Sequence, residues 1–322
     1  MRRNTLFAVA SILGSATGGA ALYGIYRRDI ARIRAAVEVG GTRIGTDCGP
    51  IEYAREGSGP PVLVIHGAGG GYDQGLMLGR EMFGSGFDVI APSRFGYLAT
   101  PAPADSSPSA QADAHAALLD QLRIFGAITV VGVSAGAPSA IELALRHPER
   151  VSALILAVPR AYAPGVPEVS APVESRTMLR MVMAGADFAF WAASRFARRS
   201  VVRFLGVPPK VEAKAAQMDR ERVTQVIRGI LPLSKRIAGL EADASAQIRG
   251  WPLERIKVPT LVISAMDDLY GTMPAAAYTA EQIPDAELMV LPSGGHLMVG
   301  RGEEVRERIG TFLRNHQQAA AA

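Results

Sequence analysis

The chain has 322 residues, of which 48% are hydrophobic and 20% charged, enough for one large α/β domain with an insertion or for two modest domains. The net charge is +4, and the Lys and Arg residues form no basic stripe interleaved with aromatic residues, so a nucleic-acid partner is not expected. Cys48 is the single cysteine, which excludes an intramolecular disulfide and a cysteine-based zinc site. The sequence implies no metal and no cofactor.

Residues 1–40 are typical of a membrane segment followed by a basic flank. The chain is uncharged from Asn4 to Tyr26, with Arg2 and Arg3 before this run and Arg27 after it. An uncharged run of about 22 residues is long enough to span a bilayer core as a helix. We therefore expect a single-pass N-terminal anchor, with the membrane as a partner. A signal peptide whose cleavage leaves a secreted or periplasmic protein, and a buried or interfacial helix, are the alternatives, and the orientation is open.

After residue 41, short apolar strands alternate with amphipathic helices, which predicts a mostly parallel sheet covered on both faces. This alternation stops between residues 160 and 252, where the pattern is helical and rich in Met, Ala and Arg. We interpret residues 41–159 and 253–322 as two parts of one core, and residues 160–252 as an inserted helical cap.

The segment from Gly132 to Gly136 has the pattern G-x-S-x-G between a predicted strand and a predicted helix. Such a turn exposes the hydroxyl of its serine, here Ser134, and the flanking glycines let the strand and helix approach closely. The backbone N–H of Ala135 then points toward a developing oxyanion. Because a serine hydroxyl needs a base to become a good nucleophile, a histidine must lie beside it.

His296 is the best candidate for this base, since it follows the last predicted strand through a glycine-containing loop. His115 and His147 lie within or at the end of predicted helices, and His316 lies in the C-terminal tail. The acid that orients the imidazole is one of two neighbours, Asp267 and Asp268, which directly follow another predicted strand. The chain order Ser, Asp, His is the one found in hydrolases with this type of turn.

The glycine-rich segment from His66 to Gly71 follows an earlier strand and favours the second half of an oxyanion hole, formed by the N–H of Ala68. A phosphate-binding loop is disfavoured, because no Gly-Lys-Ser/Thr completes it and the glycine spacing differs from a dinucleotide fingerprint.

Together these motifs resemble the α/β-hydrolase superfamily, especially its cap-bearing serine hydrolases, over residues 41–316. The resemblance implies an eight-stranded, mostly parallel sheet with helices on both faces and a cap above the strands' carboxyl ends. The position of the family's aspartate selects Asp268 over Asp267. Ser93 departs from the family, which usually has an acidic residue there.

These features predict hydrolysis of a carboxylic ester of a small or medium hydrophobic substrate through an acyl-enzyme on Ser134. The alternatives are a C–C bond hydrolase or an aminopeptidase of the same fold, and a non-catalytic ligand-binding protein. An aminopeptidase needs an acidic group for the substrate's amine, for which Glu168 and Glu174 are the candidates. The sequence does not reveal the oligomeric state.

Overall fold

The computed structural model describes the backbone of residues 2–167 and 175–321, and the side chains of residues 18–167 and 175–316. The chain forms two compact units, one up to Val39 and the other from Gly40 onward. The first unit belongs to one long helix, α1 (Arg2–Gly40).

The N-terminal segment requires a correction. In the part of the chain that the structure describes, no helix combines the length and the apolar character needed to cross a membrane. The predicted single-pass anchor is therefore wrong, and the membrane as a partner through this segment has no support. The reason is composition: nine of the 23 residues from Asn4 to Tyr26 are Asn, Thr, Ser or Gly, whose transfer into hydrocarbon is not favourable enough.

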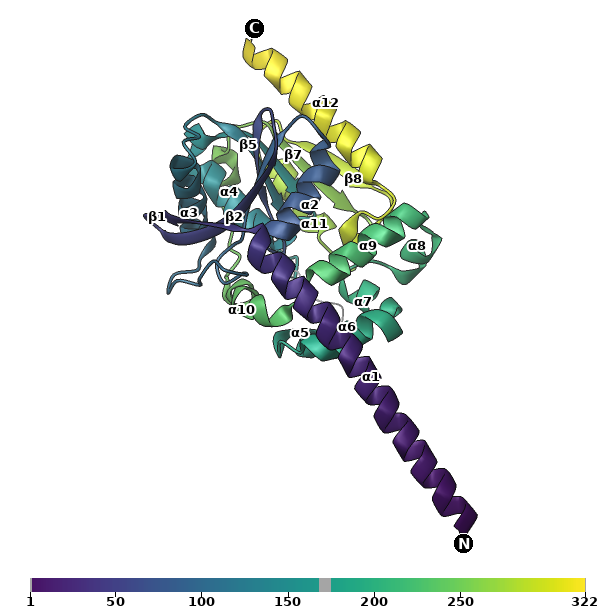
Figure 1. The fold of residues 1–322 in the computed structure, drawn as a ribbon. Helices are drawn as coiled ribbons and strands as arrows, with labels where there is room; N and C mark the ends of the chain where they lie inside the picture. Colours follow the sequence, from purple (N-terminus) through teal and green to yellow (C-terminus); the bar gives the residue numbers. More distant parts are fainter. Residues whose placement is uncertain (1, 168–174, 322) are drawn as a thin grey trace. The chain divides into compact units, whose positions relative to one another are not determined.

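The second unit is built on one eight-stranded sheet with the strand order β1-β2-β4-β3-β5-β6-β7-β8 (Figure 1). The strands β3 to β8 run parallel to one another, whereas β2 is antiparallel to both of its neighbours. The predicted sheet of eight mostly parallel strands is confirmed. The strands are β1 (Thr42–Thr46), β2 (Gly49–Gly57), β3 (Pro61–Ile65), β4 (Asp88–Pro92), β5 (Ile128–Val133), β6 (Val151–Ala157), β7 (Thr260–Ala265) and β8 (Glu287–Leu291).

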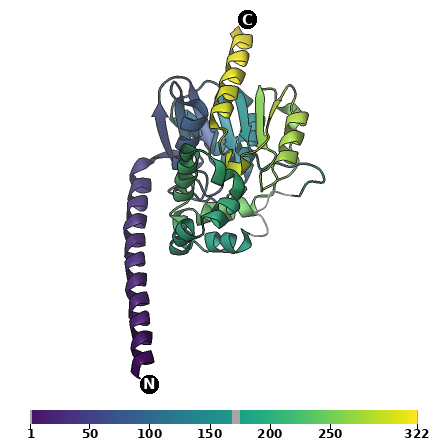
Figure 2. The ribbon, with the colours of Figure 1, turned by 90° about the vertical axis from the view of Figure 1, so that its right-hand side faces the viewer.

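The central strands are buried on both faces, which explains their nearly continuous apolar sequence. In β3, Leu63 and Ile65 pack into one hydrophobic cluster, while Val62 and Val64 pack into another on the opposite face. Because successive side chains of a strand point to opposite faces, such a strand needs helices on both sides. Figures 1 and 2 show these two helical layers. They are α2 (Tyr72–Phe83) and α12 (Gly302–Ala321) on one face, and α3 (Pro108–Gln121), α4 (Ala137–Arg146) and α11 (Met273–Gln282) on the other.

Within the described residues, six α-helices lie between β6 and β7, where the sequence predicts a helical block; we call them the helical insertion. Figures 1 and 2 show them gathered at one edge of the sheet and not on either of its faces. Whether residues 160–252 form a cap distinct from the core at those boundaries stays a prediction. The helices are α5 (Arg176–Met183), α6 (Asp187–Phe196), α7 (Arg198–Phe204), α8 (Pro209–Lys214), α9 (Gln217–Gly229) and α10 (Ile237–Ser245).

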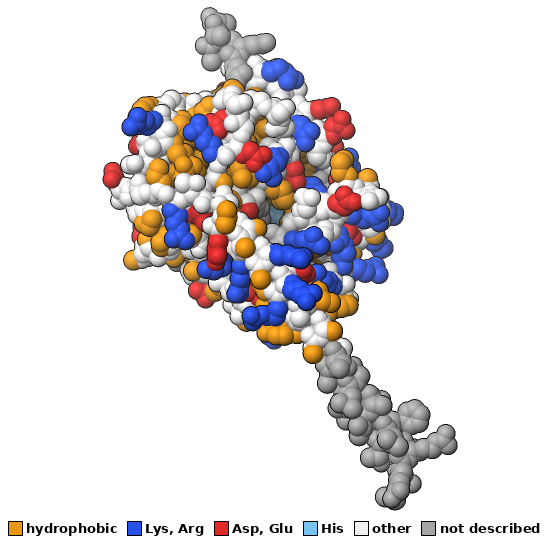
Figure 3. Space-filling model, viewed as in Figure 1, with side chains coloured by type: hydrophobic (Ala, Val, Ile, Leu, Met, Phe, Trp, Pro, Cys, Tyr) orange, Lys and Arg blue, Asp and Glu red, His pale blue; other side chains and the backbone are white. Residues whose placement is uncertain are grey.

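Within the second unit, the net positive charge is concentrated in this part of the sequence. Residues 160–252 contain 15 Lys and Arg against eight Asp and Glu, a surplus larger than that of the whole chain. Figure 3 shows Lys and Arg side chains gathered over α8 and α9. The rest of the second unit is correspondingly acidic, so the two parts differ in charge as well as in secondary structure.

Replacing a residue buried between the two layers tests this arrangement. The variant Leu63→Ala removes a fully buried side chain and should lower the free energy of unfolding by about 2–5 kcal/mol. Leu288→Ala is the control, because Leu288 lies in the last strand, β8, with 38% of its surface exposed, and its loss should cost about 1 kcal/mol or less. Urea denaturation measures both, and equal losses would contradict the burial of β3.

Candidate active site

Ser134 lies at the sharp turn between β5 and α4. Its φ is +51°, in the left-handed region that a serine rarely adopts. The glycines on either side have no room for a side chain: a Cβ on Gly132 would lie 2.6 Å from the Cβ of Ala140, and one on Gly136 would lie 2.5 Å from the carbonyl oxygen of Ile65. The turn is therefore strained at the serine and tightly packed around it, which holds the hydroxyl at the carboxyl edge of the sheet.

A chain of hydrogen bonds joins Ser134, His296 and Asp268, which follow β5, β8 and β7. The Ser134 hydroxyl lies 2.8 Å from Nε2 of His296, and Nδ1 of His296 lies 2.8 Å from Oδ2 of Asp268. A neutral imidazole fits both contacts, because it accepts the hydroxyl proton at Nε2 and donates its Nδ1–H to the carboxylate. The structure thus brings together the three residues that the sequence singles out; their catalytic roles stay predictions.

The two neighbouring aspartates have different partners. Oδ1 of Asp267 accepts a hydrogen bond of 2.8 Å from the backbone N–H of Gly295, the residue before the histidine. The buried Asp268 instead contacts the imidazole and also accepts hydrogen bonds from the backbone N–H of Tyr270 and the hydroxyl of Thr272. Asp267 therefore holds the histidine's loop, and Asp268 contacts the histidine itself.

These contacts keep Asp268 ionised. Its burial by itself would raise the pKa, but His296 and the hydrogen bonds from Thr272 and Tyr270 outweigh burial and leave the pKa below its ordinary value. A carboxylate in this position can stabilise the imidazolium that forms when the histidine takes a proton.

The loop after β3 carries the predicted oxyanion donor Ala68. The N–H of the preceding Gly67 is already bonded to Oε1 of Gln74, at 2.9 Å. Within the described residues, the N–H of Ala68 has no hydrogen-bond acceptor, so it is free to bind a substrate oxygen. Ala68 and Ala135 both line the cavity in front of Ser134. Their role as an oxyanion hole stays a prediction.

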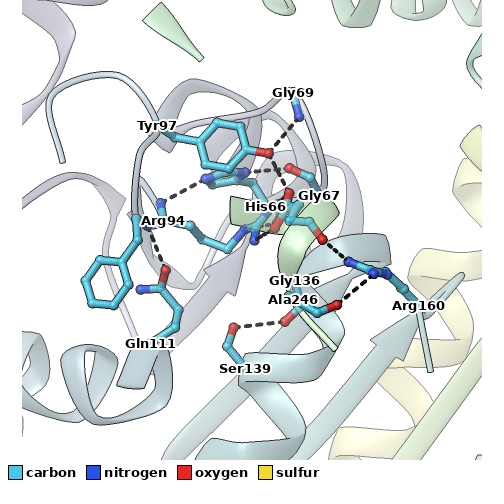
Figure 4. Close-up of polar contacts among 12 residues, drawn as sticks. His66, Gly67, Gly69, Arg94, Tyr97, Gln111, Gly136, Ser139, Arg160 and Ala246 are labelled. Atoms are coloured by element: carbon cyan, nitrogen blue, oxygen red, sulfur yellow. Dashed lines mark hydrogen bonds and ion pairs between the residues drawn. The ribbon is translucent and has the colours of Figure 1, made fainter. Parts of the chain in front are cut away.

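His66, at the start of this loop, is a buried neutral histidine (Figure 4). The backbone N–H of Arg94 donates to its Nε2 at 3.0 Å, which leaves Nδ1 to donate to the carbonyl oxygen of Gly67 at 2.7 Å. Burial, reinforced by the Arg94 guanidinium, lowers the pKa of His66 well below its ordinary value. His66 therefore fixes the loop's conformation.

A buried ion pair ties the same loop to the helical insertion. Arg94 donates from Nε to the carbonyl oxygen of His66 at 2.9 Å, and from its two terminal nitrogens to the carboxylate of Asp243 in α10, at 2.6 and 2.7 Å. The Tyr97 hydroxyl also donates to Asp243 and accepts the N–H of Gly69, a contact that Figure 4 shows. The glycine loop and α10 are thus held together by one charged cluster.

The cavity in front of Ser134 has a volume of about 410 Å³. Its polar groups include Gln74, Arg160, Arg222 and Asp243. Most other lining side chains are apolar and come from α2 and the helical insertion; they include Met77, Leu179, Met183, Phe204, Val226 and Leu240. Nothing in the described residues brings three or more His, Cys, Asp or Glu side chains together around a metal ion.

The other histidines have partners elsewhere. His147 contacts Asp113, and His316 contacts Glu287. His115 is buried in α3, where burial, with a smaller effect of Arg94, lowers its pKa to about 3.

Several residues that shape the site cannot be identified from the sequence. Gln74 is a glutamine inside a helix, and Asp243 lies in a helix more than 100 residues after Ser134. Neither belongs to a recognisable motif. Tyr270 is the exception, because its position two residues after Asp268 could have drawn attention to it.

Comparisons with known proteins agree with this geometry. Residues 60–301 match the family described as the alpha/beta hydrolase fold, and the chain belongs to this family. A 2-hydroxymuconate semialdehyde hydrolase of Pseudomonas putida is 31% identical over 272 residues, which cover 80% of this chain and 88% of the relative.

Two solved structures extend the comparison. The alpha/beta hydrolase fold protein of Nakamurella multipartita has 29% identity and a TM-score of 0.66, covering 85% of this chain and 99% of the other. A thermophilic esterase of Thermogutta terrifontis has 25% identity and a TM-score of 0.60, covering 86% of this chain and 98% of the other. An esterase and a 2-hydroxymuconate semialdehyde hydrolase are therefore similar to this chain at comparable sequence identities.

Removing Asp243 tests the buried ion pair. The variant Asp243→Ala leaves the Arg94 guanidinium buried without its carboxylate and should lower the free energy of unfolding by about 3–5 kcal/mol, measured by urea denaturation. Asp113→Ala is the control, because it removes a similarly short ion pair with Arg146 at the surface. The side chain of Asp113 is 35% exposed and that of Arg146 is 44% exposed, so the loss should be about 1 kcal/mol or less. Losses of equal size would argue against the ion pair between loop and α10.

The buried His115 predicts a specific dependence of stability on pH. Below about pH 6.5 the unfolded chain binds a proton at this histidine while the folded chain does not, so stability falls as the pH falls. Between pH 6 and pH 4.5, the wild type should lose about 2 kcal/mol more than His115→Gln, which has no titrating group there. Denaturant titrations at the two pH values measure the difference, and parallel pH dependences would contradict the prediction.

Proposed function

We propose that this protein is a serine hydrolase that cleaves a carboxylic ester of a small or medium hydrophobic substrate through an acyl-enzyme intermediate. One observation carries the proposal: the hydrogen-bonded series Ser134, His296, Asp268 ends at a largely apolar cavity. This combination offers an activated hydroxyl beside a space that favours hydrophobic groups.

In the proposed first step, the Ser134 oxygen attacks the ester carbonyl while Nε2 of His296 takes the hydroxyl proton. Asp268 stabilises the resulting imidazolium. The carbonyl oxygen becomes an oxyanion that accepts hydrogen bonds from the N–H groups of Ala68 and Ala135, each worth on the order of 10²–10³ in rate.

The imidazolium then returns its proton to the leaving alcohol, and the ester bond breaks. A water molecule attacks the acyl-enzyme, with His296 again taking a proton and delivering it to Ser134 as the acid product leaves. No metal or cofactor is needed for either half of this reaction.

The walls of the cavity support a hydrophobic substrate. The apolar side chains, among them Met183 and Phe204, surround most of the space, and methionine adapts to irregular shapes. A volume of about 410 Å³ accommodates a medium-sized acyl or alcohol group.

Hydrolysis of a C–C bond is the second candidate, and the Pseudomonas putida relative favours it. An aminopeptidase is less well supported. Glu168 and Glu174 lie outside the described residues, and the carboxylate of Asp243 at the cavity is already engaged by Arg94 and Tyr97. A ligand-binding protein without catalysis would need no contact between Ser134 and His296.

Labelling with a fluorophosphonate tests the nucleophile. We expect stoichiometric modification of Ser134, abolished in Ser134→Ala and slowed by a factor of about 10³ or more in His296→Ala. Ser109→Ala, a change of the first-turn serine of α3, is the matched control and should label like the wild type. A folded wild-type protein that does not label would favour the non-catalytic alternative.

A substrate panel tests the bond that is cleaved. We expect p-nitrophenyl esters to be hydrolysed, with kcat/KM rising as the acyl chain lengthens until the cavity is filled. The competing substrate is 2-hydroxymuconate semialdehyde, assayed with the same enzyme preparation. Turnover of the semialdehyde together with inactivity toward every ester would overturn the ester proposal.

A further inference from the structure

The end of α7, in the helical insertion, is bonded to both loops that carry the predicted acid and base. The carbonyl oxygen of Gly206 accepts the backbone N–H of His296 at 3.1 Å and the backbone N–H of Leu269, next to Asp268, at 3.0 Å. One carbonyl group therefore bridges the segment after β7 and the segment after β8.

Tyr270 makes a second connection between the same elements. Its hydroxyl donates to the carbonyl oxygen of Phe204 at 2.6 Å, and its backbone N–H donates to Asp268. Its ring packs edge-on against the imidazole of His296, with 4.7 Å between the ring centres. The half-buried tyrosine thus contacts the insertion, the acid and the base.

The contact at Gly206 leaves no space for a side chain. A Cβ at this position would lie 2.4 Å from Cδ2 of Tyr270 and 2.6 Å from Cβ of His296. On the other side of the contact, a Cβ on Gly295 would lie 2.7 Å from Cα of Val207. The backbone of the insertion and the backbone of the histidine loop touch directly, so a displacement of one displaces the other.

We propose that the turn Phe204–Val207 is the element that positions His296 against Ser134, with Gly206 as the positioning residue. This inference rests on the proposed serine-hydrolase function. Phe204 and Leu205 also line the cavity. The wall that contacts the substrate and the backbone that holds the base are therefore one segment, which couples the placement of the base to the placement of the insertion.

The variant Gly206→Ala tests the proposal. The added methyl group must push Tyr270 or His296 aside, and a shift of about 1 Å in a reacting group lowers the rate about 10²-fold. We expect kcat for a short p-nitrophenyl ester to fall by about 10-fold to 100-fold, while KM changes by about twofold or less. The far-downfield proton resonance of the hydrogen bond between His296 and Asp268 should shift or disappear.

Gly185→Ala is the matched control. Gly185 lies two residues after the end of α5, as Gly206 lies two residues after the end of α7. Their φ values are +61° and +74°, and both N–H groups bond back to the preceding helix. Its Cβ would meet only side-chain atoms of Ile237 at 3.2 Å or more and a Cα of Ser234 at 3.8 Å. We expect this variant to lose about as much thermal stability as Gly206→Ala. Its kcat and its proton resonance should stay those of the wild type.

A second variant keeps the test valid if Gly206→Ala does not fold. Tyr270→Phe keeps the ring and removes only the hydrogen bond to Phe204; we expect kcat to fall about threefold to 10-fold without a matching change in KM. The positioning proposal would be overturned if the folded Gly206→Ala and Tyr270→Phe variants kept the kcat and the proton resonance of the wild type. It would also be overturned if Gly185→Ala lost as much kcat as Gly206→Ala. Failure of the wild type itself to label or turn over would instead refute the proposed function, while the resonance would still report on positioning.

Discussion

The hydrogen bond between the Ser134 hydroxyl and Nε2 of His296 joins residues 162 positions apart at 2.8 Å. This contact depends on the parallel sheet, because β5, β7 and β8 all present their carboxyl ends at one edge. Gly132 permits the close packing of α4 on β5, and Gly136 permits the close approach of the turn to the end of β3. These two contacts fix the position of the serine. The hydrophobic core on both faces of the sheet thus holds three short loops in fixed positions relative to one another.

The helical insertion takes part in this arrangement as much as the sheet does. Asp243 in α10 holds the glycine loop through Arg94, and Gly206 after α7 holds the histidine loop through a backbone hydrogen bond. The glycine loop and the histidine loop are therefore each attached to the insertion. An insertion that provides only a cover for the substrate would not need a buried ion pair, which is costly to desolvate.

Buried charge near the site is distributed so that His296, the predicted base, contacts one ionised carboxylate. His296 and the hydrogen bonds from Thr272 and Tyr270 keep the pKa of Asp268 low, whereas burial keeps His66 and His115 neutral. The positive charge of Arg94 is balanced by Asp243, and its Nε–H is bonded to the carbonyl oxygen of His66 in the glycine loop. Among the described histidines, His296 is the one hydrogen-bonded to Ser134.

The sequence by itself determined the elements whose signals are local. The elbow at Ser134 is recognisable because strand, glycines and helix follow one another within a few residues. His296 and the pair Asp267 and Asp268 are recognisable because each lies in a short loop after a strand, and the resemblance to the family then selects Asp268. Local composition also misled: the uncharged run at the N-terminus suggested a membrane span, but its many Ser, Thr and Gly residues make it insufficiently apolar.

Only the tertiary structure decided which distant residues support these elements. Ser93 stands where the family usually has an acid, and the structure supplies a carboxylate from β2, since Glu52 accepts hydrogen bonds from the Ser93 hydroxyl and the N–H of Ala99. The contacts of Asp243 and Gly206 are likewise invisible in the sequence. Each of these contacts joins one polar group of a helix or turn to a loop far away in the chain. A single contact of this kind leaves no periodic pattern in either segment.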